Sequence, residues 1–77
     1  MDNFFKLANA EYVMARRKYK PFNSTHEGWA VIQEEVDELW DMIKASKKTR
    51  IDNPRMVNEC IQIAAMAYAF VKDLGDK

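Results

Sequence analysis

The sequence predicts an all-α fold of three helices, residues 3–18, 25–47 and 54–74, which assemble into an oligomeric helical bundle. Apolar residues recur at helical spacing in each segment. Residues that favour helix starts stand directly before the second and third segments. The third segment is apolar nearly all round, which is typical of a helix buried on every side, and two other helices are too few to surround it. Residues 1–77 are short enough to form a single domain that adds a partner subunit.

The first predicted helix has an aromatic and alanine stripe and a basic end. The stripe repeats every three or four positions, at Phe4, Ala8, Tyr12, Ala15 and Tyr19. The helix ends in Arg16, Arg17, Lys18 and Lys20. Cations near a helix C-terminus complement its dipole, and phosphate contact is the alternative role. Pro21 disfavours helical angles at the residue before it, so a connector begins there.

The second predicted helix places acids among apolar residues. Ser24 and Glu27 stand at the spacing of a capping box. At about 100° per residue, one apolar arc forms. Its members are Trp29, Ile32, Val36, Leu39, Trp40 and Ile43. Glu35 falls inside this arc and Glu38 lies at its edge. Burying an unpaired carboxylate costs several kcal/mol, so Glu35 indicates compensation by a cation.

The third predicted helix begins with Asn53 as its cap and Pro54 at its first position, and Gly75 is a suitable stop. A broad apolar face contains Met56, Val57, Cys60, Ile63, Ala64, Ala67, Phe70, Val71 and Leu74. Ala65 and Ala69 line the opposite side, where small residues suit a close crossing with another subunit. We therefore expect a homo-oligomer.

Composition narrows the class of protein. Twelve basic and twelve acidic residues cancel, which argues against non-specific binding to nucleic acid or anionic membranes. The longest apolar run, residues 63–71, is far shorter than the roughly 20 residues of a membrane span. The one cysteine, Cys60, excludes an internal disulfide and fits a reducing compartment. We expect a soluble, cytoplasmic protein.

Glu59 is the one carboxylate in the middle of the third helix, at the edge of its apolar face. Residues three apart on a helix have Cβ atoms about 5–6 Å apart, so Glu35 and Glu38 can reach one ion. The short connection favours antiparallel helices, which would bring Glu59 near the pair. Three converging carboxylates suit Mg²⁺ or Mn²⁺ rather than zinc. On spacing alone, ion pairs with lysine or arginine from another helix fit these acids equally well.

These residues also form a two-part motif. Glu34-Glu35-x-x-Glu38, then twenty residues, then Glu59-x-x-Gln62 resembles the EExxE…ExxD signature of the MazG-like nucleotide pyrophosphohydrolases. The resemblance covers roughly residues 22–74, and residues 26–40 are similar to the short, single-domain, often phage-associated members. It implies a Mg²⁺-dependent hydrolase that cleaves a nucleoside triphosphate to the monophosphate and pyrophosphate. It also implies a homo-dimer or homo-tetramer.

The resemblance implies a role for each matching residue. Glu35, Glu38 and Glu59 would ligate the metal, with Glu34 and Glu38 as catalytic residues, Glu34 by orienting water or binding a second ion. The basic candidates for phosphate contact are Lys18, Lys20, Arg50 and Arg55. The aromatic candidates for stacking on a base are Phe22, Trp29 and Tyr68, whose alternative role is core packing.

Gln62 departs from the family pattern, which has aspartate at that position. The amide oxygen can still ligate a metal, but one negative charge is lost from the site. This leaves open a slow enzyme, a changed substrate, or a non-catalytic helical oligomer. Such an oligomer would bind a nucleotide or a protein partner through the same surface.

Overall fold

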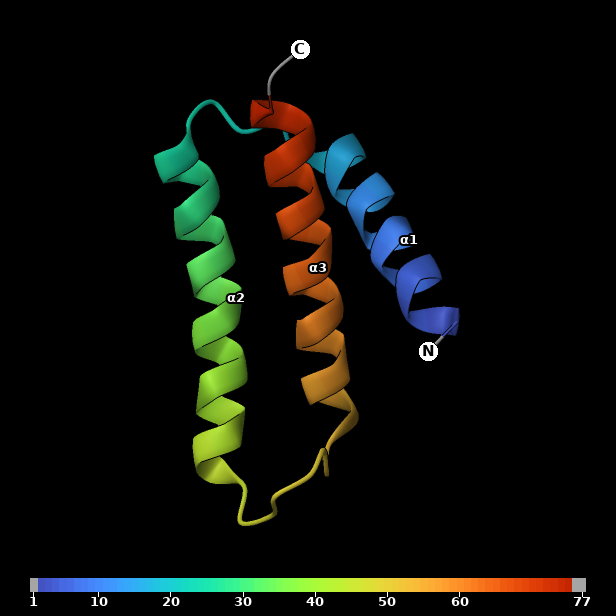
Figure 1. Cartoon of the computed structure of the whole chain (residues 1–77), viewed down its shortest axis with the longest axis vertical. Coiled ribbons are helices and arrows are strands. Elements are labelled where there is room, and N and C mark those ends of the chain that lie inside the picture. Colours follow the sequence, from blue (N-terminus) through green and yellow to red (C-terminus); the bar gives the residue numbers. More distant parts are fainter. Residues whose placement is uncertain (1, 76–77) are drawn as a thin grey trace.

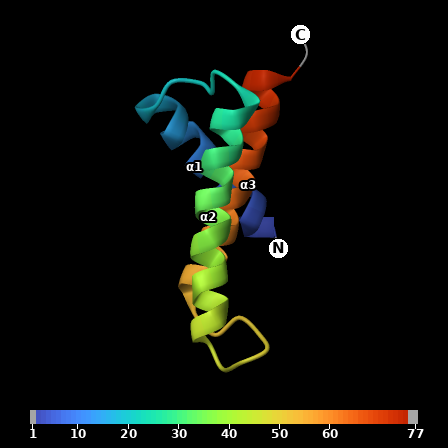
Figure 2. The same cartoon turned by 90° about the vertical axis from the view of Figure 1, so that its left-hand side faces the viewer.

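The computed structural model describes residues 2–75 and contains three α-helices: α1 (Asp2–Lys18), α2 (Thr25–Ala45) and α3 (Pro54–Leu74). No strand occurs within this range, so the predicted all-α class is confirmed. Figure 1 shows α2 and α3 as antiparallel neighbours, with α1 on the other side of α3. Viewed from the side of α2, α1 crosses α3 obliquely (Figure 2). Among the residues described, α1 and α2 do not pack on one another, so α3 is the central element.

Local hydrogen bonds explain where α2 and α3 begin. The Ser24 hydroxyl accepts a hydrogen bond from the Glu27 backbone N–H (3.1 Å), and Glu27 Oε1 accepts one from the Asn23 N–H (2.6 Å). Asn53 Oδ1 accepts a hydrogen bond from the Arg55 N–H (2.9 Å), directly before α3. Each cap satisfies a backbone donor that has no partner within the helix. Both helices begin at the predicted residues.

The end of α2 differs from the prediction, because the helix stops at Ala45 rather than near residue 47. Ser46 is extended (φ −84°, ψ 146°). Its hydroxyl accepts a hydrogen bond from the Lys48 N–H (3.1 Å) and donates one to Asp52 Oδ2 (2.7 Å). A serine side chain that bonds nearby backbone in this way competes with helical pairing. The α2–α3 connector therefore begins two residues earlier than expected.

The buried part of α3 matches only in part the face that the apolar pattern favoured, because Met56 belongs to that face whereas Ile61, Ala65 and Ala69 do not. Its buried side chains are Met56, Ile61, Ala65 and Ala69. Ala65 and Ala69 thus pack inside the chain, whereas we expected them to meet another subunit. Val71, from the predicted face, is exposed. Because α3 is apolar nearly all round, its periodicity does not select a side, and small alanines allow neighbouring helices to approach closely.

The covered face of α2 includes Glu35 and differs in part from the predicted apolar arc. Glu35, Leu39 and Met42 are half-buried, whereas Trp29 and Trp40 from the predicted arc are 56% and 54% exposed. Among the helices of residues 2–75, α2 has only one neighbour, α3, which covers one side of it. Nowhere in residues 2–75 does a helix combine the length and the apolar content needed to cross a membrane.

Gly28 lets the start of α2 approach the rest of the chain. A Cβ at this position would lie 2.6 Å from the Phe70 ring of α3 and 3.3 Å from the Phe22 ring of the α1–α2 connector. Real Cβ atoms essentially never come as close to another atom as the 2.6 Å to Phe70, and Gly28 is buried. The absence of a side chain here brings α2, α3 and the connector together at one end of the molecule.

Candidate metal centre and adjoining groove

Three carboxylates converge between α2 and α3. Glu35 and Glu38 lie one helical turn apart in α2, and Glu59 faces them from α3. One carboxylate oxygen from each residue lies within 4.8 Å of the others. Glu35 and Glu59 are half-buried, and Glu38 is exposed. The antiparallel arrangement of α2 and α3 therefore brings together the acids that the sequence places on separate helices. We call Glu35, Glu38 and Glu59 the acidic cluster.

Among the side chains of residues 3–75, no basic group neutralises the acidic cluster by direct contact. The ion pairs within 4.0 Å among these side chains are Arg16–Asp73 and Lys44–Asp41. Neither includes a member of the acidic cluster. Arg55, one turn before Glu59 in α3, contributes only a weaker, longer-range attraction. Ion pairs with lysine or arginine, the alternative left open by the spacing, are therefore not formed within this part of the chain.

The surroundings raise the pKa of Glu38 and of Glu59. Hydrogen bonding through a proton shared with Glu59, and then repulsion from the Glu59 charge, raise the pKa of Glu38 above its ordinary value. Burial raises the pKa of Glu59, followed by a proton shared with Glu35. The positive charge of Arg55 lowers the pKa of Glu38 and of Glu59, but does not offset these effects. Full ionisation of the acidic cluster is thus unfavourable without a compensating charge.

The donor set fits a hard divalent cation. When all three acids are ionised, none can donate a hydrogen bond to another, and Glu59 Oε1 is buried without a hydrogen-bond partner. A buried oxygen without a partner is costly in protein interiors. Carboxylate oxygens from three side chains are the ligands that Mg²⁺ and Mn²⁺ prefer. A bound ion of this kind would satisfy the Glu59 oxygen and neutralise the repulsion.

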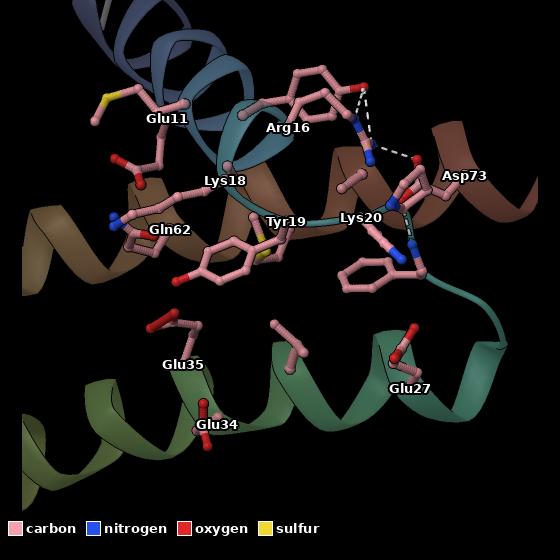
Figure 3. Close-up of a pocket in the computed structure, with 18 of the residues that line it drawn as sticks. Glu11, Arg16, Lys18, Tyr19, Lys20, Glu27, Glu34, Glu35, Gln62 and Asp73 are labelled. Atoms are coloured by element: carbon pink, nitrogen blue, oxygen red, sulfur yellow. Dashed lines mark hydrogen bonds and ion pairs between the residues drawn. The ribbon is translucent and has the colours of Figure 1, made fainter.

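A groove of about 680 Å³ adjoins the acidic cluster and is lined by α1, the α1–α2 connector, α2 and α3. Glu35 lines the groove and also belongs to the acidic cluster, so the two are continuous. Figure 3 shows Glu35 extending from α2 toward Tyr19, with Glu34 beside it on α2, and Lys18 and Tyr19 on the side of α1 and the connector. The α2 wall of the groove is thus acidic, whereas the wall formed by α1 and the connector carries basic side chains together with Glu11.

Two of the four basic residues predicted to contact phosphate line the groove, and the other two do not. Lys18 and Lys20 line the groove. Arg55 lies outside the groove, on α3 near the acidic cluster. Arg50 is in the α2–α3 connector and does not line the groove. Lys18 and Lys20 are therefore the pair best placed to meet a ligand that occupies the groove.

The predicted aromatic contacts also separate. Phe22 lines the groove, whereas Trp29 and Tyr68 do not. The Tyr68 ring packs edge-to-face against Tyr12 of α1, with ring centroids 4.8 Å apart. Within one chain, Tyr68 therefore joins α1 to α3, and Trp29 remains exposed on α2. Gln62 lines the groove from α3, one turn after Glu59.

Sequence reasoning missed two features of this site. Glu11 and Tyr19 line the groove, although the stripe that includes Tyr19 indicated packing and nothing in the spacing of Glu11 distinguishes it from other helix residues. The third helix also carries Asp73 in its last turn, where a negative charge is unfavourable to the helix dipole. An acid at the C-terminal end of a helix is favourable only if hydrogen-bond donors or cations compensate its charge, so this position could have indicated such partners. The structure shows them: Asp73 binds Arg16 and the Phe22 backbone N–H.

No family model matches the chain, and comparison with curated proteins and with solved structures finds no significant match. The chemistry of the site is therefore inferred from the chain's own residues.

Proposed function

We propose that this chain is a divalent-metal-dependent hydrolase that cleaves nucleoside triphosphates to the monophosphate and pyrophosphate. The convergence of Glu35, Glu38 and Glu59 beside the groove is the observation that supports it most strongly. The resemblance of residues 34–62 to the MazG-like signature supports it independently. The basic residues Lys18 and Lys20 on the facing wall suit the negative charge of a triphosphate.

Each groove residue has a role in this proposal. Glu35, Glu38 and Glu59 hold Mg²⁺ or Mn²⁺, and Gln62 can add its amide oxygen. When bound, such an ion supplies Lewis-acid polarisation of the phosphate chain and lowers the pKa of bound water. Glu34, which lines the groove outside the acidic cluster, orients the attacking water and accepts its proton.

The substrate's charge and base are met by other side chains of the groove. Lys18 and Lys20 attract the phosphate oxygens and so hold the triphosphate in the groove. Phe22 lines the groove and offers an aromatic ring on which a base can stack. Such stacking depends little on which base is bound.

Pyrophosphate release from a panel of NTPs and dNTPs with Mg²⁺ tests this function. We expect Glu38→Gln to lower turnover by at least about 100-fold, since it removes a preorganised charge at the reaction centre. Asp37→Asn is the matched control, because Asp37 is the neighbouring exposed acid outside both the acidic cluster and the groove. Absence of Mg²⁺-dependent release, or release that is insensitive to Glu38→Gln, would refute the proposal.

A non-catalytic helical oligomer that binds a nucleotide or a protein partner is the second candidate. Gln62 favours it, because a neutral amide lines the groove where the family signature has a carboxylate. Gln62→Asp discriminates between the two candidates. A weakened enzyme gains Mg²⁺ affinity or turnover from the restored charge, whereas a scaffold gains neither.

We infer that the chain forms a homo-dimer or homo-tetramer. One face of α2 leaves a row of large apolar side chains exposed, namely Trp29, Val36, Trp40 and Ile43. Burying such side chains contributes about 25 cal/mol per Å², which favours a second copy over solvent. Sedimentation analysis tests this inference: we expect Trp40→Lys to shift the wild-type oligomer toward monomer. A wild-type monomer at assay concentrations would contradict it.

A further inference from the structure

One carboxylate joins the walls of the groove at the end where α1 leads into the connector. Asp73 of α3 has a side chain only 6% exposed. Its Oδ1 forms an ion pair with Arg16 Nη2 of α1, and its Oδ2 accepts a hydrogen bond from the Phe22 backbone N–H of the connector (2.9 Å) (Figure 3). Both oxygens are therefore engaged, each by a different element.

α3, rather than α2, is the helix against which α1 packs. No residue from 3 to 18 is fully buried, and α1 does not pack on α2. Arg16 also donates hydrogen bonds to the Tyr12 hydroxyl (3.1 and 3.3 Å), and the Tyr12 ring packs on Tyr68 of α3. The position of α1 relative to α2 is thus set through α3. The Arg16–Asp73 ion pair is the charged contact between α1 and α3.

The second partner of Asp73 reaches α2. The Phe22 ring lies against Gly28, where an added Cβ would come within 3.3 Å of it. The connector is thus held by its backbone to α3 and by its ring to α2. Lys20 lies two residues before this point and Lys18 four, and both line the groove. Movement of Phe22 or Arg16 would therefore displace these basic side chains.

We propose that Asp73 is a positioning residue, which, through Arg16 and Phe22, holds Lys18 and Lys20 across the groove from Glu34 and Glu35. Its ligand-binding consequence rests on the proposed function. Its effect on the position of α1 does not. The acidic cluster lies on α2 and α3 alone, so its affinity for a cation is independent of this link.

Asp73→Asn tests the proposal because asparagine keeps the shape of the side chain but offers one oxygen instead of two. It can accept from Arg16 or from the Phe22 N–H, not from both. We expect the KM for a deoxynucleoside triphosphate, and the Kd for α,β-imido-dUTP and α,β-imido-dATP, to rise about tenfold. That factor corresponds to one lost hydrogen bond to a charged group. The kcat at saturation and the Kd for Mg²⁺ alone should stay within about twofold of wild type.

Asp52→Asn is the matched control. It removes one negative charge from the α2–α3 connector, at the opposite end of the molecule, while the amide oxygen can still accept the hydrogen bond from the Ser46 hydroxyl. We expect no change in KM, kcat or Mg²⁺ affinity. Arg16→Gln provides a milder second variant, because the bond from the Phe22 N–H to Asp73 remains. A rise in KM smaller than that of Asp73→Asn would support the proposal. An unchanged KM in both folded variants would overturn it, as would an equal loss of Mg²⁺ affinity.

Amide hydrogen exchange tests the positioning of α1 without any ligand. We expect Asp73→Asn to accelerate exchange in α1 and the α1–α2 connector while α2 and α3 keep their protection. Uniform acceleration in all three helices, or none, would overturn the proposal. If the wild-type protein binds neither Mg²⁺ nor a nucleotide, the proposed function fails, and these exchange rates still decide whether Asp73 positions α1.

Discussion

Asp73 and the acidic cluster use the same functional group in opposite ways. The Asp73 carboxylate is almost fully buried, yet each of its oxygens has a donor, from Arg16 and from the Phe22 N–H. Glu59 is only half-buried, but its Oε1 is buried without a partner and two further acids lie within 4.8 Å. The more buried acid is satisfied, and the less buried ones are not.

The difference separates an acid whose partners lie within the chain from acids that repel one another and include an oxygen without a partner. A satisfied carboxylate stabilises the fold, whereas clustered carboxylates destabilise it until a cation binds. Proteins commonly retain such unfavourable arrangements where activity needs them. The contrast predicts that cation addition, charge removal and pH will affect the two regions differently.

Addition of Mg²⁺ should change the stability of the folded protein more than any other test, and only by binding to the acidic cluster. At a concentration 100 times its Kd, binding to the folded state adds about 2.7 kcal/mol to the free energy of unfolding. We expect a rise in Tm of about 10 °C or more, measured by circular dichroism and reversed by EDTA. Glu38→Gln should abolish the rise. A Tm that does not respond to Mg²⁺ would favour a purely structural role for the three acids.

Asp73→Asn should reduce the free energy of unfolding by about 2 kcal/mol, because it removes one hydrogen bond to a charged group from a buried site. Urea unfolding measures this change. The loss should be the same with and without Mg²⁺, since the acidic cluster does not include Asp73. A stability equal to that of wild type would show that Asp73 is not the structural acid described above.

In the absence of metal, Glu59→Gln should raise the free energy of unfolding, whereas Asp73→Asn lowers it. Removing one of the converging charges, and leaving an amide that can donate to Glu35 or Glu38, should stabilise the metal-free protein by about 1 kcal/mol at neutral pH. The same variant should lose its response to Mg²⁺. Thermal unfolding in EDTA and in Mg²⁺ measures both changes. Destabilisation in EDTA would mean that Glu59 is satisfied in the folded state.

The pH dependence of the metal-free protein should be the smallest effect. Glu38 and Glu59 have folded-state pKa values raised above 4.5, so the folded state holds their protons more tightly than the unfolded state. The stability they contribute is present at acid pH and is lost as pH rises through the raised pKa values. Comparing Tm from about pH 4.5 to 8 in EDTA, we expect wild type to lose more than Glu59→Gln. Parallel curves would contradict the assigned shifts.

Much of the fold follows from local sequence. Ser24, Asn53 and Pro54 mark helix starts because caps and first-turn prolines act on neighbouring backbone groups. Glu35 and Glu38 share a helix face because they are three residues apart. Glu59 could be expected near them because the short connection favours antiparallel helices. These predictions depend on spacing and short connections, which a single sequence contains.

Other features were decided only by tertiary structure. The side of α3 that is buried, at Ala65 and Ala69, could not be chosen from a helix that is apolar all round. The exposure of Trp29 and Trp40 follows from the packing of α1 on α3 rather than on α2. Periodicity reports on one helix at a time and is silent on how helices cross.

The groove shows the same division. The sequence by itself determined which residue types were available: the acids of α2 and α3, and the basic end of α1. Tertiary structure decided that Lys18 and Lys20 line the same groove as Glu34 and Glu35, whereas Arg50 does not line it. It also paired Arg16 with Asp73, 57 residues apart. Contacts over such separations depend on the angle and position at which helices pack, and side-chain spacing along the chain does not encode these.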